Sequence, residues 1–418
     1  MVSTLLRRAT IVHDAVTHSA CDVLIVDGVI AGVAPTIDVG PEIDDIDLTD
    51  WLLSPAAVEP HAHLDKAFLA EQIVNPTGDL MGAIVAMEQH RHLLSVDSIA
   101  ERAERAARLM ASNGYQMVRT HADLTVENGL RSVEALCEVK RRVADVIDVE
   151  IVALCGWPVV GPSGADQRAL LVEAMAVGAD LVGGCPHLET SGDITAATEF
   201  FLQTATDHGV GVDLHIDETL DPNVLGVVDL ANLVLAGFDH DVTASHCVSL
   251  GMQPLDRQRD VAELVAAAGI SVIALPHTNL FLQGRGTAPM PRGLTAVAAL
   301  RAAGVNVAAG ADNLQDPFNP MGRACPFETA SLMVMTSHLL PHEAWSSVTG
   351  AAASSVGRRA NTVVVGQPAN LLAVPATTIR EAIAFGPSQR MVLHNGQLLD
   401  ETNCSRSGSR AAGAADLG

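Results

Sequence analysis

The middle of the chain alternates short apolar segments with longer segments that have helical periodicity. The apolar segments lack the polar–apolar alternation of a half-exposed sheet, which predicts parallel strands that are buried on both faces. Eight strands are expected, at 51–58, 116–120, 150–154, 180–184, 210–215, 241–246, 271–275 and 305–310. The helices expected between them include 98–113, 130–144, 165–177, 194–208, 257–268 and 295–303. This order predicts an α/β fold, a closed (β/α)8 TIM barrel.

The two ends of the chain have a different pattern, in which short β segments are joined by tight turns. A hairpin is expected around Asp27-Gly28, and a second one near the other end around Asn395-Gly396. We therefore expect residues 1–55 and 360–400 to form one small β-sandwich domain beside a barrel of residues 56–359. The tail at 401–418 is rich in Ser, Gly and Ala, which predicts disorder.

Charge and cysteine content narrow the possible partners. The formal net charge of -24 argues against binding to nucleic acid or to anionic membranes, since both require clustered basic residues. The 7 cysteines are odd in number and contain no CxxC pair, which disfavours a disulfide framework and a structural zinc site. The sequence also shows no signal peptide or long apolar run. We expect a soluble cytoplasmic protein.

Histidines collect where the expected strands end. Of the 16 histidines, these seven occupy such positions: His61, His63, His121, His187, His215, His246 and His277. The carboxyl ends of barrel strands open onto one face, where active sites form. The alternative, polar residues scattered in exposed loops, does not explain why so few histidines lie at the opposite ends.

A metal site is the chemistry that this pattern favours. His61 and His63 are two apart on a strand and therefore face the same side. His215 and Asp312 add a third nitrogen and an oxygen, a set that suits zinc or ferrous iron and leaves room for an activated water. Glu218 is a candidate for proton transfer or an ordinary loop residue, and His246 is a candidate to orient the nucleophile or a hydrogen-bonded histidine of the barrel mouth.

Motifs of other enzyme classes are missing from the sequence. There is no HExxH, GxSxG, Walker A or GxGxxG motif, and no PCxxC follows His187-Leu-Glu189. Chemistry that depends on a nucleotide cofactor is therefore not expected.

Six motifs, in order along the chain, resemble the bacterial cytosine deaminase branch of the amidohydrolase superfamily. They are VEPHAHLD at 58–65, VRTHAD at 118–123, HIDE at 215–218, TASH at 243–246, LQGR at 282–285 and GADNLQDP at 310–317. The resemblance implies one divalent ion, zinc or iron, held by His61, His63, His215 and Asp312. It further implies a proton shuttle at Glu218, help with water activation from His246, a second role for Asp312 as a base, and Gln283 in the pocket.

The departures from that branch concern the substrate. The glutamine that contacts the pyrimidine amide is missing from the stretch Leu154-Cys-Gly-Trp157-Pro, and Asn313 replaces a second acidic residue. An aromatic residue persists at Phe318. Trp157 is a candidate to stack on a planar ring or a packed loop residue, and Lys66 is a candidate to meet an anionic group or a solvated lysine.

The function expected is hydrolytic deamination of an amino-substituted nitrogen heterocycle (pyrimidine-, triazine- or purine-like) by a metal-bound hydroxide, with release of ammonia. Cytosine itself is disfavoured as the substrate. Hydrolysis of another C–N bond, in an N-alkylamino heterocycle or a cyclic amide, is the close alternative. A barrel without catalysis and a metal-dependent aldolase or lyase are more distant ones. Relatives commonly associate, so a homo-oligomer is possible.

Overall fold

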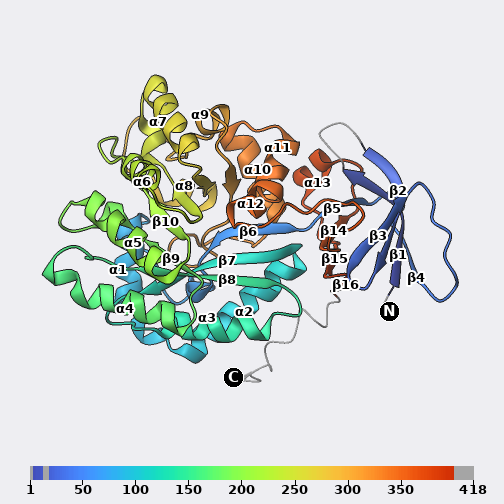
Figure 1. Ribbon diagram of the computed structural model, residues 1–418, viewed down its shortest axis with the longest axis horizontal. Coiled ribbons are helices and arrows are strands. Elements are labelled where there is room, and N and C mark those ends of the chain that lie inside the picture. The colour runs from blue at the N-terminus through green and yellow to red at the C-terminus, as the bar shows by residue number, and fades with distance from the viewer. Residues whose placement is uncertain (1–2, 13–17, 400–418) are drawn as a thin grey trace, which may run out of the picture.

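The computed structural model describes residues 3–12 and 18–399, and the expected disordered tail at 401–418 lies outside these described residues. Two sheets organise the chain, a parallel barrel and a smaller mixed sheet to one side of it (Figure 1). None of the helices in the described ranges is long and apolar enough to cross a membrane.

The barrel consists of eight parallel strands that follow one another in sequence order. They are β6 (Ala57–Ala62), β7 (Tyr115–Leu124), β8 (Asp148–Cys155), β9 (Leu181–Gly184), β10 (Val212–Ile216), β11 (Val242–His246), β12 (Ser271–Ala274) and β13 (Val307–Ala309). The chain after β13 closes the ring against β6, because the Asp312 amide donates to the His61 carbonyl at 3.0 Å. The Ala311 amide also donates to the buried carboxylate of Glu59 on β6, at 3.0 Å. The predicted (β/α)8 barrel is confirmed.

Helices cover the outside of the barrel, and the helices expected from the sequence are present. The α-helices are α1 (Leu80–Gln89), α2 (Val96–Ser112), α3 (Arg131–Arg142), α4 (Ala165–Val177), α5 (Ile194–His208), α6 (Gly226–Leu235), α7 (Leu255–Ala267), α8 (Pro276–Leu282), α9 (Val297–Ala302), α10 (Pro326–Ser337), α11 (Pro341–Ser347), α12 (Gly350–Ser355) and α13 (Ile379–Phe385). Short 3-10 turns are η1 (Leu64–Lys66), η2 (Arg91–Leu93), η3 (Pro162–Gly164), η4 (Pro186–Leu188) and η5 (Ser249–Met252). Helix α5 shows why such segments start and stop where they do. Asp193 accepts a hydrogen bond from the Ala196 amide at its start, and Gly209 takes a left-handed φ of 66° at its end.

The small sheet combines both ends of the chain, as the sequence predicted. Its strands are β1 (Ser3–Val12), β2 (His18–Val26), β3 (Val29–Ala34), β4 (Asp44–Asp47), β5 (Leu52–Pro55), β14 (Leu371–Val374), β15 (Met391–His394) and β16 (Gln397–Leu398). The two ends meet where β14 pairs antiparallel with β5. Both expected hairpin turns are present, and their central residues all have the positive φ that such turns require: Asp27 47°, Gly28 82°, Asn395 49° and Gly396 76°.

One predicted strand, at 51–58, is wrong in its bounds. The structure divides it at Ala56, so that β5 belongs to the small sheet and β6 to the barrel. Leu52, Leu53, Ala57 and Val58 are all buried, so the apolar pattern runs through the division without a break. The pattern shows burial but not the sheet to which a strand belongs.

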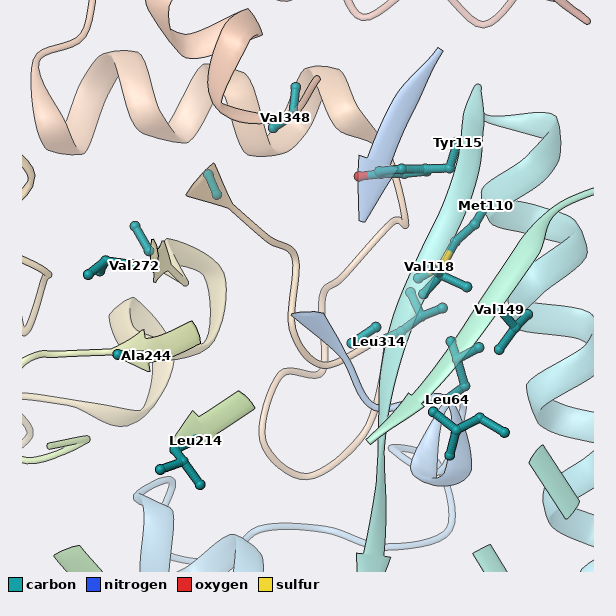
Figure 2. Packing of buried hydrophobic residues seen from close by; sticks show 14 of the residues in the cluster. Leu64, Met110, Tyr115, Val118, Val149, Leu214, Ala244, Val272, Leu314 and Val348 are labelled. Atoms are coloured by element: carbon teal, nitrogen blue, oxygen red, sulfur yellow. The ribbon is translucent and has the colours of Figure 1, made fainter. Parts of the chain in front are cut away.

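Strand alternation separates the packed core from the polar interior of the barrel. Leu214, Ala244 and Val272 on β10, β11 and β12 belong to the apolar cluster that contains Met110 of α2 (Figure 2). Their neighbours along each strand face the opposite side. On β10 these neighbours are Asp213 and His215, so the alternation that buries Leu214 also directs a histidine into the barrel.

Candidate metal centre and active site

Five imidazoles converge at the carboxyl ends of the strands. They belong to His61 and His63 at β6, His121 on β7, His215 on β10 and His246 on β11, and each is at most 5% exposed. The contacting pairs have ring centroids separated by 4.0 Å for His61 and His121 and by up to 5.6 Å for His61 and His246. His187 and His277 do not join this group. The His187 ring forms a hydrogen bond with the His215 carbonyl, and the His277 ring forms one with the Thr329 hydroxyl.

The four residues expected to ligate a metal lie together. His63 Nε2 is 3.2 Å from His215 Nε2 and 3.3 Å from Asp312 Oδ1. His61 Nε2 is 3.6 Å from the same Asp312 oxygen. Two ligand atoms that each lie about 2.0–2.1 Å from a tetrahedral ion are roughly 3.3 Å apart. The observed separations therefore fit a divalent ion.

The hydrogen-bonding state of these atoms also fits a metal. His61 Nε2 and both Asp312 oxygens are buried and make no hydrogen bond within the described residues. Burying such an atom without a partner costs about 1–3 kcal/mol, which coordination would offset. Burial and the neighbouring imidazoles lower the pKa of His61 and His215 well below the usual value, so both rings are neutral, as a metal requires.

Two further histidines border this set. The ligand atoms of His61, His121 and His215 lie within 4.8 Å of one another, and so do those of His61, His246 and Asp312. His121 was expected at a strand end but not as a ligand, and both of its nitrogens are without a hydrogen-bond partner in the described part of the chain. His121 is therefore a further candidate ligand, which the sequence analysis did not identify.

A buried polar network, called here the barrel-floor network, orients His61 from below. Ser245 Oγ lies 2.9 Å from His61 Nδ1 and donates to Asp213 Oδ1 at 3.1 Å. Arg119 donates to Asp213 Oδ2 at 3.0 Å and to Glu150 Oε2 at 2.6 Å. Such a contact fixes the ring tautomer and leaves Nε2 for the metal.

Sequence reasoning missed this network, although a signal was present. Arg119 precedes His121 by two residues, and Asp213 precedes His215 by two, so each pair shares one face of its strand. A charged residue on the inward face of a buried strand needs a partner inside the barrel.

Glu218 and His246 border the four candidate ligands. Glu218 Oε1 lies 3.7 Å from His246 Nδ1, and His246 Nε2 lies 4.0 Å from Asp312 Oδ2. Burial and the Asp312 carboxylate raise the pKa of Glu218 well above the usual value, which favours the protonated form of this side chain. Asn279 Oδ1, at 3.0 Å from His246 Nδ1, holds the histidine in place.

The backbone is strained at two of these positions. His246 has a φ of 71° and Asp312 a φ of 63°, both in the left-handed region that side chains larger than glycine rarely adopt. Strain of this kind collects at functional sites, where the surrounding structure imposes it.

A cavity of about 460 Å³ opens above the site. Of the residues expected to contact substrate, these four line it: Lys66, Trp157, Asn313 and Phe318. Gln283 is not among the lining residues in the described chain. Its side-chain amide lies 3.4 Å from the Glu218 carbonyl, so it supports the loop that carries Glu218.

Lys66 is a buried residue and not a solvated lysine, since it is only 3% exposed. Its ammonium lies 2.7 Å from Asp123 Oδ1 and 2.9 Å from His63 Nδ1. Burial opposes the charge, but the carboxylates of Asp123 and Asp65 outweigh it and raise the lysine pKa. A cationic side chain therefore lies in the cavity wall beside His63.

Comparison with known proteins agrees with this geometry. Residues 69–400 match the amidohydrolase family. A pterin deaminase from Rhizobium rhizogenes is 34% identical over 391 residues, which cover 91% of this chain and 88% of that protein.

Two solved structures are similar over nearly their full length. A 5-methylcytosine deaminase from Klebsiella pneumoniae, liganded with 5-fluorocytosine, has a TM-score of 0.86 at 29% identity and covers 95% of this chain and 97% of its own. An N-isopropylammelide isopropylaminohydrolase from Burkholderia multivorans has a TM-score of 0.80 at 27% identity, with 95% and 98% covered. The family match spans most of the chain and the pterin deaminase is more than 30% identical over most of both proteins, so the chain belongs to the amidohydrolase family.

Proposed function

We propose that this protein is a metal-dependent hydrolase that deaminates an amino-substituted nitrogen heterocycle, with a pterin-like ring as the preferred class. The observation that carries the proposal is the position of Glu218. This buried carboxylate with a raised pKa borders a set of metal-ligand atoms at the base of a cavity large enough for a fused ring. Cavities of ~300–1,000 Å³ commonly accept organic ligands of drug size.

The proposed ligands of the single divalent ion, zinc or iron, are His61, His63, His215 and Asp312. A bound ion of this kind lowers the pKa of water and supplies the nucleophile. Asp312 and His246 then orient and accept protons at the attacking oxygen, and Glu218 transfers a proton to the ring nitrogen and to the departing amine. A C–O bond forms, the C–N bond breaks, and one water yields a ring carbonyl and ammonia.

The cavity walls suit a planar ring. Trp157 and Phe318 offer aromatic surface, and Leu80 and Ile84 of α1 add apolar surface. The relative that acts on a pterin makes a fused pteridine the first ring to test. Cytosine stays disfavoured, because the glutamine expected to contact a pyrimidine amide is absent from 154–158.

Ammonia release from a panel of rings tests the proposal. The protein is loaded with zinc or iron(II), its metal content is measured, and pterin, 5-methylcytosine, cytosine and N-isopropylammelide are supplied separately. We expect fastest release from pterin, and release slower by at least about 10²-fold from the Glu218→Gln variant at equal metal content. Isopropylamine as the sole product would favour the alternative C–N hydrolysis. No amine from any ring at full metal load would overturn the proposal.

A further inference from the structure

Lys66 and Asp123 form a donor and an acceptor side by side in the cavity wall. Lys66 lies in η1, directly after β6, and Asp123 lies near the end of β7. The Asp123 side chain is 30% exposed and lines the cavity, while Lys66 lines it with only 3% of its side chain exposed. Lys66 donates to Asp123 Oδ1 at 2.7 Å, and Asp123 Oδ2 accepts no hydrogen bond from the described residues. We call these two residues the Lys66–Asp123 pair.

The surrounding structure holds the pair in place. Asp65 Oδ2 accepts from the Asp123 amide at 2.9 Å, and Asp65 Oδ1 lies 3.5 Å from the Lys66 ammonium. A buried ion pair adds little to stability, because desolvation cancels much of its attraction. A pair that is fixed, charged and still open to a cavity is better explained by a ligand that completes its hydrogen bonds.

The Lys66 ammonium also contacts His63. Lys66 lies 2.9 Å from His63 Nδ1. An ammonium carries three N–H groups, and Asp123 Oδ1 and His63 Nδ1 lie within hydrogen-bond distance of Lys66 as partners for two of them. A third N–H is therefore available for an acceptor in the cavity.

We propose that the Lys66–Asp123 pair recognises a lactam edge, –NH–C(=O)–, on the substrate ring. Asp123 Oδ2 accepts from the ring N–H, and Lys66 donates to the ring carbonyl. The Lys66 ammonium contacts the Asp123 carboxylate through Oδ1 at 2.7 Å. Standard bond lengths place the nitrogen and oxygen of a lactam about 2.2 Å apart, so one lactam edge can contact both groups. Ligand atoms of His63, Asp65 and Asp123 lie within 4.8 Å of one another, so a lactam bound to the pair would lie beside His63 and the proposed metal site.

This inference rests on the proposed function and narrows its substrate class. The preferred rings carry an amino group on the carbon next to a lactam nitrogen, the arrangement of a 2-amino-4-oxo ring. Rings without the lactam leave the buried pair unsatisfied and are discriminated against for that reason.

The test compares two rings and two forms of the enzyme. The rings are 2-amino-4-oxopteridine and 2-aminopteridine, and the forms are the wild type and Asp123→Asn, both loaded with metal. For each ring, kcat/KM of the wild type is divided by kcat/KM of the variant, and this ratio cancels the intrinsic reactivity of the ring. We expect Asp123→Asn to lower kcat/KM about 10–100-fold for the lactam ring, the range of a hydrogen bond to a charged group. For the ring without the lactam we expect less than about a threefold change, because no such bond is lost.

Controls separate the pair from the fold and from the chemistry. Glu134→Gln on α3 removes one exposed negative charge and should leave kcat/KM unchanged for both rings. Lys66→Met removes the donor and should selectively lower kcat/KM for the lactam ring, which provides a second variant if Asp123→Asn folds poorly. An equal loss for both rings would overturn the inference and leave the deaminase proposal intact.

Binding gives a readout that does not depend on turnover. The dissociation constants of the two rings are measured by quenching of tryptophan fluorescence, since Trp157 lines the cavity. If Asp123→Asn binds the lactam ring more weakly but the other ring equally well, the inference is supported even when neither ring is deaminated. Unchanged binding of the lactam ring overturns it.

Discussion

The interior of the barrel has two layers that treat buried polar atoms in opposite ways. In the barrel-floor network, Arg119, Asp213 and Ser245 satisfy one another with hydrogen bonds of 3.0–3.1 Å. In the layer above it, called here the upper layer, His61 Nε2 and both Asp312 oxygens have no partner within the described residues. A chain that pairs its charges this thoroughly in one layer leaves the next layer open for a ligand that is not protein.

Removal of the metal should affect the upper layer most. We expect addition of zinc or iron(II) to the chelated protein to raise its stability by about 4 kcal/mol at a thousandfold excess over the dissociation constant. His215→Ala should abolish both this gain and the activity. Thermal melting with and without metal measures the gain, and His208→Ala, at the exposed end of α5, is the control. A gain that survives in His215→Ala would place the ion elsewhere.

Glu218 tests whether the upper layer performs the chemistry. We expect Glu218→Gln to lower kcat about 10²–10⁴-fold, the usual range for loss of a proton-transfer group. Metal content should stay unchanged, because Glu218 is not among the proposed ligands. Steady-state kinetics with metal analysis measures both, with Glu199→Gln on the surface of α5 as control. Activity within threefold of wild type would remove Glu218 from the mechanism.

Arg119 belongs to the barrel-floor network, the lower layer, and its test measures stability instead of activity. Arg119→Met should destabilise the protein by about 3–5 kcal/mol, because Asp213 and Glu150 would be left as unpaired acids. Urea unfolding measures the loss. The double variant Arg119→Met/Asp213→Asn should recover part of it, since the neutral amide no longer requires a counter-charge. A single variant as stable as wild type would show that the lower layer is not held by charge.

Ser245 contacts both layers, and its replacement by alanine should have the smallest effect of these variants. Ser245→Ala removes the contact that orients His61, so we expect metal affinity to fall about 10–100-fold. Unfolding of the metal-free protein should change by only about 1 kcal/mol. Competition with a chelator measures affinity, with Ser354→Ala as control. A larger loss of stability than of affinity would make Ser245 a structural residue.

The sequence predicted the layer that contains histidines better than the layer that supports it. His61, His63, His215 and Asp312 could be found because strand ends are visible as breaks in the apolar pattern. The partners Arg119, Asp213 and Ser245 come from three strands, and their contacts depend on barrel closure, which periodicity does not specify. Lys66 gave no sign of burial, because a single lysine after a strand has the same pattern whether exposed or paired. The division at Ala56 was missed for the related reason that both strands are equally apolar.

The position of Ala56 also affects how the two sheets move relative to each other. Ala56 alone separates β5 of the small sheet from β6, the strand that carries His61. Ala56 is buried, and its amide donates to the Asn370 carbonyl at 3.0 Å, so no flexible linker divides the two sheets. A hinge between them would displace a proposed metal ligand with every opening. We therefore expect the enzyme to admit its substrate by movement of the loops around the barrel mouth, while the two sheets move as one body.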